Sequence, residues 1–181
     1  MEEEKTSNIV DNIKNKEDKT AIKAAYKNLL IRIIVLLVVG YLLFSQVFLI
    51  TQAKGMEMFP AIKDGDLIIG FRLQRQYVKN DVLVYKVEGK QKIGRLVARA
   101  TDVVTIDEDG TLRVNGTVQS GEIMYPTYGK EEITYPYKVP EKNVFILGDY
   151  RTQAQDSRDL GPIPINKVKG KVITILRRQG L

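Results

Sequence analysis

The sequence has no cysteine and no histidine among its 181 residues. Without cysteine the chain has no disulfide framework, no thiol nucleophile and no thiolate metal site. Without histidine it lacks the commonest general base and the commonest metal ligand. We therefore expect no cofactor and no metal, and any catalysis would have to use Lys, Asp, Glu, Ser, Thr or Tyr.

Positive charge is also not concentrated anywhere in the chain, although the formal net charge is +6 and the pI about 9.4. The cations are scattered and no predicted helix carries them as a stripe, so we expect no nucleic-acid partner. With 44% hydrophobic residues, the chain can bury one core of ordinary size.

One long apolar run, residues 33–50, carries no charge and is interrupted only by Gly40, Ser45 and Gln46. At about 1.5 Å per residue it approaches the ~30 Å hydrocarbon thickness of a bilayer. The run predicts a single transmembrane helix, with bounds 29–52. A buried core helix is the alternative, whereas a cleaved signal peptide fits poorly because the run is too long and a charged leader precedes it.

Basic residues are more frequent before the predicted span than after it. Only Lys54 follows closely, whereas four cations precede: Lys19, Lys23, Lys27 and Arg32. The positive-inside rule then predicts a single-pass plasma-membrane protein with its N-terminus in the cytoplasm. We expect residues 1–28 to form a partly disordered cytoplasmic tail, and residues 53–181 to form one extracytoplasmic domain.

The part after the span consists of short β-rich runs separated by turn signals. Asn115-Gly116 is a strong hairpin signal. The predicted strands include 67–69, 82–85, 103–106, 112–114, 144–147 and 168–176.

Four ordered segments of this outer part resemble the sequence boxes of type I signal peptidases, the peptidase S26 family. Residues 54–60, Lys-Gly-Met-Glu-Met-Phe-Pro, resemble the nucleophile box Gly-x-Ser-Met-x-Pro. The other segments are 63–69 with 78–85, 92–98 with Asp102, and 145–151 with 156–158 and Gly161. The resemblance implies an all-β, signal-peptidase-like fold of coiled antiparallel sheets, preceded by one transmembrane helix.

The same resemblance implies a Ser/Lys dyad whose lysine is oriented by a further serine, and all three positions are changed here. The nucleophile position holds Glu57, the base position Gly94 and the orienting position Ala154. Glycine and alanine side chains cannot accept or relay a proton. We therefore expect no catalytic residues and a catalytically inactive signal peptidase homologue.

Residues that the resemblance marks as architectural are retained. Arg95 and Asp149 match one structural ion pair, and Asp156 and Arg158 match another. Loss confined to the chemical positions is typical of a pseudoenzyme.

Glu57, at the changed nucleophile position, and three residues beside it are candidates for binding. Glu57 has three possible interpretations: a solvated carboxylate without a partner, a partner for a cation of a bound protein, or a catalytic group. Met56, Met58 and Phe59 are candidate groove-binding residues, with ordinary core packing as the alternative.

The chain resembles one branch of the family, the non-catalytic signal-peptidase-like accessory proteins of Gram-positive pilus clusters. That branch implies a chaperone-like factor for sortase-dependent pilus polymerisation, with pilin subunits, a class C sortase or both as partners. Two alternatives remain open: an active serine peptidase with a displaced nucleophile such as Ser157, and a regulatory subunit of an authentic signal peptidase.

Overall fold

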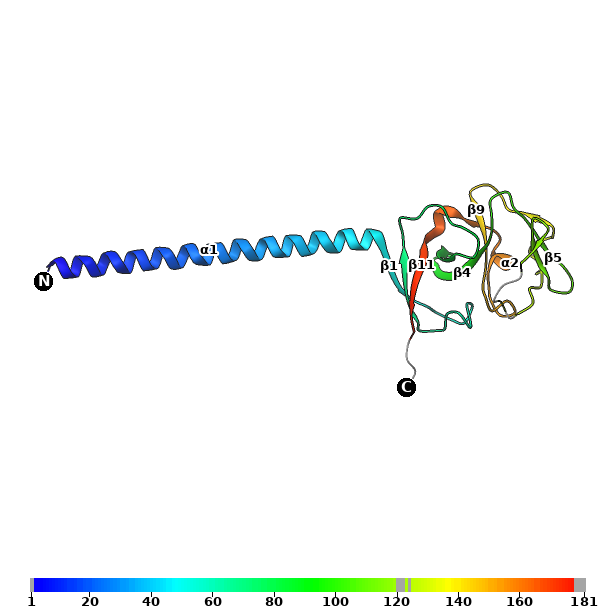
Figure 1. Ribbon diagram of the computed structural model, residues 1–181, viewed down its shortest axis with the longest axis horizontal. Coiled ribbons are helices and arrows are strands. Elements are labelled where there is room, and N and C mark those ends of the chain that lie inside the picture. The colour runs from blue at the N-terminus through cyan, green and yellow to red at the C-terminus, as the bar shows by residue number, and fades with distance from the viewer. Residues whose placement is uncertain (1, 120–122, 124, 178–181) are drawn as a thin grey trace. The chain divides into compact units, whose positions relative to one another are not determined.

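The computed structural model describes residues 2–119, 123 and 125–177 (Figure 1). The chain divides into two compact units, Met1–Ser45 and Gln46–Leu181. The first unit is helical, and the second contains every strand of the described residues.

Helix α1 spans Glu2–Val47. Residues 2–39 contain neither glycine nor proline and are rich in Glu, Lys, Ile and Leu, most of which tolerate a helix well. Residues 2–28, which the sequence analysis expected to be a partly disordered tail, lie in the N-terminal part of α1. Within α1, Ala25–Val47 has a mean hydropathy of 2.3 and is long and apolar enough to cross a membrane.

The helix ends earlier than the predicted span, whose bounds were 29–52. Strand β1 (Phe48–Gln52) begins directly after Val47 and pairs antiparallel with β2 (Leu67–Phe71). Apolar runs cannot be divided into helix and strand by hydropathy alone. The Phe-Leu-Ile-Thr sequence suits a strand once a partner strand is available.

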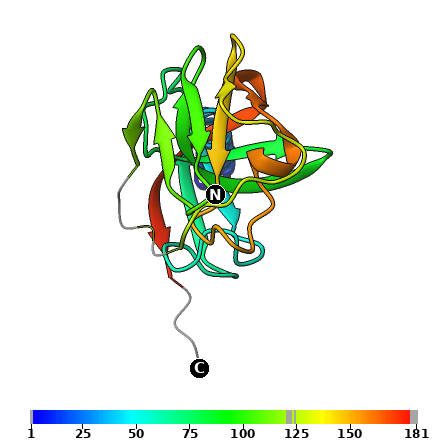
Figure 2. The same cartoon turned by 90° about the vertical axis from the view of Figure 1, so that its right-hand side faces the viewer.

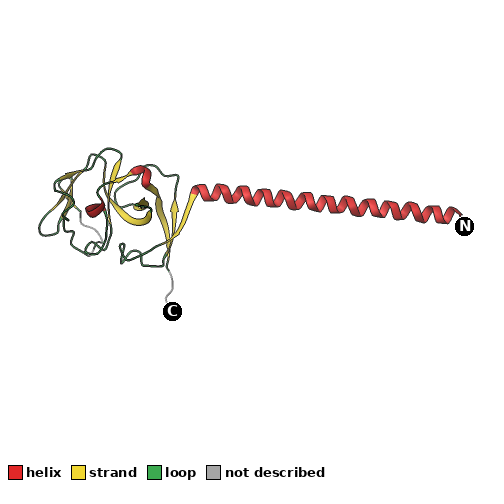
Figure 3. Ribbon diagram, turned by 180° about the vertical axis from the view of Figure 1, so that it is seen from behind, coloured by secondary structure: helices red, strands yellow, loops and turns green. Residues whose placement is uncertain are grey.

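Two antiparallel sheets make up the second unit, which confirms the all-β prediction. The larger has the order β1-β2-β11-β3-β4-β9-β10, and the smaller the order β7-β6-β5-β8. The remaining bounds are β3 Val82–Val87, β4 Lys90–Arg99, β5 Val103–Ile106, β6 Leu112–Val114, β7 Thr117–Val118, β8 Tyr137–Lys138, β9 Asn143–Leu147, β10 Ile163–Pro164 and β11 Val168–Leu176. The short helical segments described among these strands are α2 (Ser157–Leu160) and the 3-10 turn η1 (Ile165–Lys167), which are drawn in red in Figure 3.

Every predicted strand is present in the structure. Asn115 and Gly116 have φ values of 51° and 78° and join β6 to β7 as the predicted hairpin turn. Figure 2 shows the sheets of the second unit, called the β-unit from here on, from a second side.

Strand β4 positions the candidate site because it lies between β3 and β9 in the larger sheet. One face of this region packs into a cluster with the loop after β1: Leu49, Ala53, Met58, Ile62, Ile68, Val84 and Ile93. The other face contributes to a second cluster with Leu83, Tyr85, Leu96 and Ile146. Residues 53–62 are thereby held against the sheet, which fixes Glu57 close to β4.

Candidate functional site

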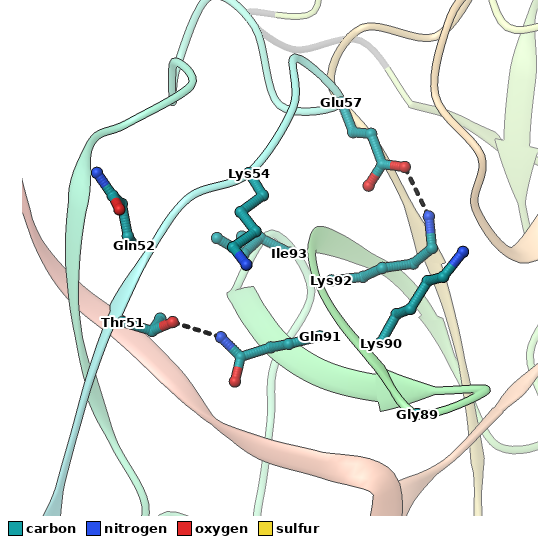
Figure 4. A pocket seen from close by; sticks show the side chains of 9 residues that line it. All are labelled: Thr51, Gln52, Lys54, Glu57, Gly89, Lys90, Gln91, Lys92 and Ile93. Carbon is teal, nitrogen blue, oxygen red and sulfur yellow. Dashed lines mark hydrogen bonds and ion pairs between the residues drawn. The ribbon is translucent and has the colours of Figure 1, made fainter.

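A groove of about 580 Å³ lies between the end of β1, the loop that follows it and the start of β4 (Figure 4). Most of the residues that line it have polar side chains: Thr51, Gln52, Lys54, Glu57, Gly89, Lys90, Gln91, Lys92 and Ile93. Near β1, the Gln91 amide donates to the Thr51 hydroxyl at 2.5 Å. The groove thus contains three lysines and a single carboxylate.

That carboxylate, on Glu57, forms an ion pair with Lys92. The Lys92 Nζ lies 2.6 Å from Glu57 Oε1 and also donates to the carbonyl oxygen of Gln155 at 3.2 Å. The Lys92 and Glu57 side chains are 12% and 26% exposed. The interpretation of Glu57 as a solvated carboxylate without a partner was therefore wrong.

Strand geometry explains how Lys92 comes to lie beside Glu57. The sequence analysis did not identify Lys92 as a residue of the site. Successive side chains alternate between the faces of a strand, so Lys92 and Gly94 lie on the same face of β4. A lysine two residues before the empty base position can therefore extend toward the nucleophile position. The period-2 spacing of residues 92 and 94 is visible in the sequence, but the resemblance assigns the base to residue 94 alone.

The base position itself has no room for a side chain. A Cβ atom added to Gly94 would lie 2.5 Å from Cγ2 of Ile146 and 3.4 Å from the ring of Tyr85. Ile146 has no exposed surface, and Tyr85 is 1% exposed. A lysine at residue 94 would have to displace this packing.

Residue 154, which the resemblance assigns to the orienting group, is buried next to Gly148. Ala154 is 1% exposed, and a Cβ added to Gly148 would lie 2.4 Å from the Ala154 Cβ and 2.6 Å from the Glu57 carbonyl oxygen. The Tyr150 amide donates to that carbonyl at 3.0 Å. The structure therefore brings the backbones around Glu57 and Ala154 together through Gly148.

Met58 faces inward from the groove. It is 3% exposed and belongs to the core cluster with Ala53, Ile62 and Ile93. These side chains line a pit of about 10 Å³ that Glu57 also borders. A pit of this size holds about one water molecule or one methyl group, so only a small group could enter it.

The other two candidate groove-binding residues lie away from the groove lining. Met56 is 43% exposed, and the Phe59 ring packs against Tyr150 with centroids 5.9 Å apart. Phe59 lines a different hollow, which also includes Arg95 and Asp149. The three candidates therefore do not form one surface.

Both ion pairs that the resemblance implies are present. Arg95 contacts Asp149 through two hydrogen bonds of 2.8 and 2.6 Å, and Arg158 contacts Asp156 through two of 2.9 Å. The Asp156 carboxylate also accepts from the Gly148 amide at 3.0 Å. These pairs hold the loop between β9 and α2 in place next to Glu57.

Neither Ser157 nor Tyr85 is available for chemistry in the groove. Ser157 has no exposed surface, and its Oγ accepts a hydrogen bond from the Ile146 amide at 2.9 Å. As a displaced nucleophile, Ser157 would first have to become accessible to a substrate. Burial, followed by the carboxylates of Glu57, Asp156 and Asp159, raises the pKa of Tyr85, so its phenol stays protonated.

Known proteins similar to this chain are signal peptidases and related processing peptidases. Signal peptidase I of Bacillus licheniformis is 26% identical over 94% of this chain and 91% of that protein. Probable thylakoidal processing peptidase 2 of Arabidopsis thaliana is 33% identical, and the match covers 65% of this chain but only 35% of the relative. A solved signal peptidase I of Enterococcus faecalis V583 is 25% identical, covering 55% of this chain and 97% of that one, with a TM-score of 0.44.

The model of the family "Signal peptidase, peptidase S26" matches residues 26–176. The match takes in the apolar part of α1 and the strands from β1 to β11. The chain belongs to the peptidase S26 family.

Proposed function

We propose that this chain is a membrane-anchored, non-catalytic member of its family that holds an extended peptide segment without cleaving it. One observation carries the proposal: Glu57 occupies the nucleophile position and is engaged in a 2.6 Å ion pair with Lys92. In signal peptidases a neutral lysine takes the proton of a serine hydroxyl, and the positions that the resemblance assigns to these groups hold Gly94 and Glu57 here.

Lys92 is a poor replacement for the missing base. Its Nζ donates to both Glu57 and Gln155, whereas a general base must offer a free lone pair to a hydroxyl. The hydroxyl among the described lining residues belongs to Thr51, and it is bonded to Gln91 and to no lysine. The geometry thus supports binding better than hydrolysis.

The groove suits an extended chain. Strand β1 is at the edge of the larger sheet, and among the described strands it pairs with β2 alone, so its other edge could accept a further strand. Peptides commonly bind by adding a strand to such an edge, with the affinity coming from main-chain hydrogen bonds and the specificity from side-chain pockets. The pit beside Met58 would accept only a small side chain.

The finer parts of the proposal come from the resemblance to pilus-cluster accessory proteins and from the lysine asymmetry around α1. We place the N-terminus in the cytoplasm and the β-unit outside the plasma membrane. There the groove would hold a pilin segment, or a segment of a class C sortase, and so promote pilus polymerisation as a chaperone would.

A hydrolysis assay tests the absence of catalysis. The full-length chain in detergent micelles is mixed with an internally quenched signal-peptide substrate, and the variant Lys92→Met serves as the matched control. We expect both proteins to release product no faster than buffer alone. Turnover by the wild type that Lys92→Met abolishes would overturn the proposal and favour an active peptidase.

A deletion strain tests the pilus role separately. Removing the gene should leave unpolymerised pilin, and the wild-type gene should restore the ladder of polymers seen on a gel. Normal ladders in the deletion strain would refute the pilus role while leaving the binding role intact.

A further inference from the structure

Two of the three lysines in the groove have no partner among the described residues. In the described part of the chain, neither the Lys54 nor the Lys90 ammonium forms a hydrogen bond or an ion pair, whereas Lys92 pairs with Glu57. Figure 4 shows Lys54 directed from the loop after β1 toward β4, and Lys90 projecting from β4. The two ammonium groups therefore come from different walls of the groove, the loop after β1 and the start of β4.

This arrangement gives the groove an excess of positive charge. Glu57 neutralises Lys92, and the lining contains no second carboxylate to neutralise Lys54 or Lys90. A concave site lined by charges of one sign concentrates the field and favours ligands of the opposite sign. An all-apolar segment would leave both ammonium groups without a counter-charge.

We propose that the extended segment held in this groove carries a carboxylate, which Lys54 and Lys90 bind from the two walls. Glu57 then has the role of a built-in counter-charge that keeps Lys92 from adding a third free cation. This inference rests on the proposed peptide-binding function of the groove. It assigns Lys54 and Lys90 to ligand recognition, although the signal peptidase chemistry uses neither position.

A peptide fits the observations better than a lipid phosphate. The wall formed by β1 lies along a sheet edge with which no other described strand pairs, and an extended peptide can add to such an edge whereas a headgroup cannot. The carboxylate could belong to an internal Asp or Glu side chain or to a free C-terminus. The ligand chemistry is the same in both cases, and the probes below distinguish them.

The experiment measures the binding of matched peptides to the full-length chain in neutral detergent micelles by fluorescence anisotropy. The probes are a labelled Ala/Thr/Val-rich nonapeptide amide with two internal aspartates, its counterpart with two asparagines, and the asparagine peptide with a free C-terminal carboxylate. The protein variants are Lys54→Gln, Lys90→Gln, the double variant and Glu57→Gln. Lys138→Gln, on the smaller sheet, is the matched charge control because this lysine is exposed and lies outside the groove lining.

We expect the aspartate peptide, or the free-acid peptide, to bind more tightly than the asparagine amide. Exposed ion pairs contribute modestly, so each single lysine variant should weaken acidic binding about two- to fivefold and the double variant about tenfold. Glu57→Gln should strengthen the binding of the aspartate peptide about two- to fivefold, because this substitution frees Lys92. High salt should reduce these differences, and Lys138→Gln should behave as wild type.

Each contrary outcome has a defined meaning. Equal binding of acidic and amide peptides would overturn the carboxylate inference and leave the peptide-binding function standing. Failure of every peptide to bind would overturn both. Displacement of the aspartate peptide by short-chain phosphatidylglycerol at equal concentration would reassign the lysines to lipid phosphate, and weaker acidic binding by Glu57→Gln would refute the counter-charge role.

Discussion

Substituting Gly94 with alanine should destabilise the β-unit far more than a glycine-to-alanine change usually does. The added Cβ would lie 2.5 Å from Cγ2 of Ile146, which is closer than non-bonded carbon atoms come. Ile146 has no exposed surface and packs in the cluster with Leu83, Tyr85 and Leu96, so it cannot rotate into solvent. Overpacking of this kind costs about 1–3 kcal/mol.

The origin of that cost can be tested with a double-mutant cycle. Ile146→Ala removes the clashing atom and by itself costs about 2–5 kcal/mol because it leaves a cavity. If the clash is real, Gly94→Ala should cost much less in the Ile146→Ala background, with a coupling free energy of about 1 kcal/mol or more.

Urea unfolding of the full-length chain in micelles measures these free energies through near-UV circular dichroism of the tyrosines, because the sequence has no tryptophan. Gly40→Ala is the control, since a Cβ there meets nothing within 4 Å. A Gly94→Ala variant within about 0.5 kcal/mol of the wild type would show that residue 94 has room for a side chain. The steric argument against a lysine at the base position would then fail.

Three further predictions concern other parts of the chain. Asp156→Asn should lower the free energy of unfolding in urea by about 3–5 kcal/mol, because it leaves the Arg158 guanidinium, which is 2% exposed, without its counter-charge. The control Arg113→Ala breaks an exposed pair with Asp107 and should lower it by less than about 1 kcal/mol. Equal losses for the two variants would contradict this reasoning. Lys92→Met should change the free energy of unfolding by less than about 1 kcal/mol, since Glu57 can then be solvated; a larger loss would mean that the pair is structural. Protease added to intact protoplasts should remove the β-unit and leave a short membrane-bound stub, and protection of the β-unit until lysis would contradict the proposed orientation.

The sequence predicted the strands well because their signals are local. Alternation, β-branched residues and turn pairs such as Asn115-Gly116 are set within a few residues, and the hairpin formed where the turn required positive φ values. The end of the apolar helix was predicted poorly because β1 is equally apolar. Its strand conformation depends on pairing with β2, about 20 residues further along the chain.

The candidate site was predicted only in part, for a similar reason. The boxes predicted the partners of Arg95 and Arg158, and the structure shows both ion pairs. The assignment of Glu57, Gly94 and Ala154 to the chemical positions comes from the same boxes and stays a prediction. Contacts between segments that lie far apart in the sequence could not be predicted from the boxes. The Glu57–Lys92 pair joins residues 35 positions apart, and the separation of Met56, Met58 and Phe59 depends on how the loop after β1 packs.

These contacts also explain why restoring a Ser/Lys dyad in this chain should fail at more than one step. Glu57→Ser would release Lys92, but a lysine at residue 94 would meet Ile146, and Ala154 is buried with its Cβ close to Gly148. The double variant Glu57→Ser, Gly94→Lys should therefore lose stability before it gains activity. Because Glu57→Ser leaves a free Lys92 in the groove, this single variant should bind acidic peptides more tightly while still failing to cleave them. Cleavage by Glu57→Ser alone, with Lys92 as its base, would mean that the groove holds substrates in a productive geometry and that the missing hydroxyl is what prevents catalysis in the wild type.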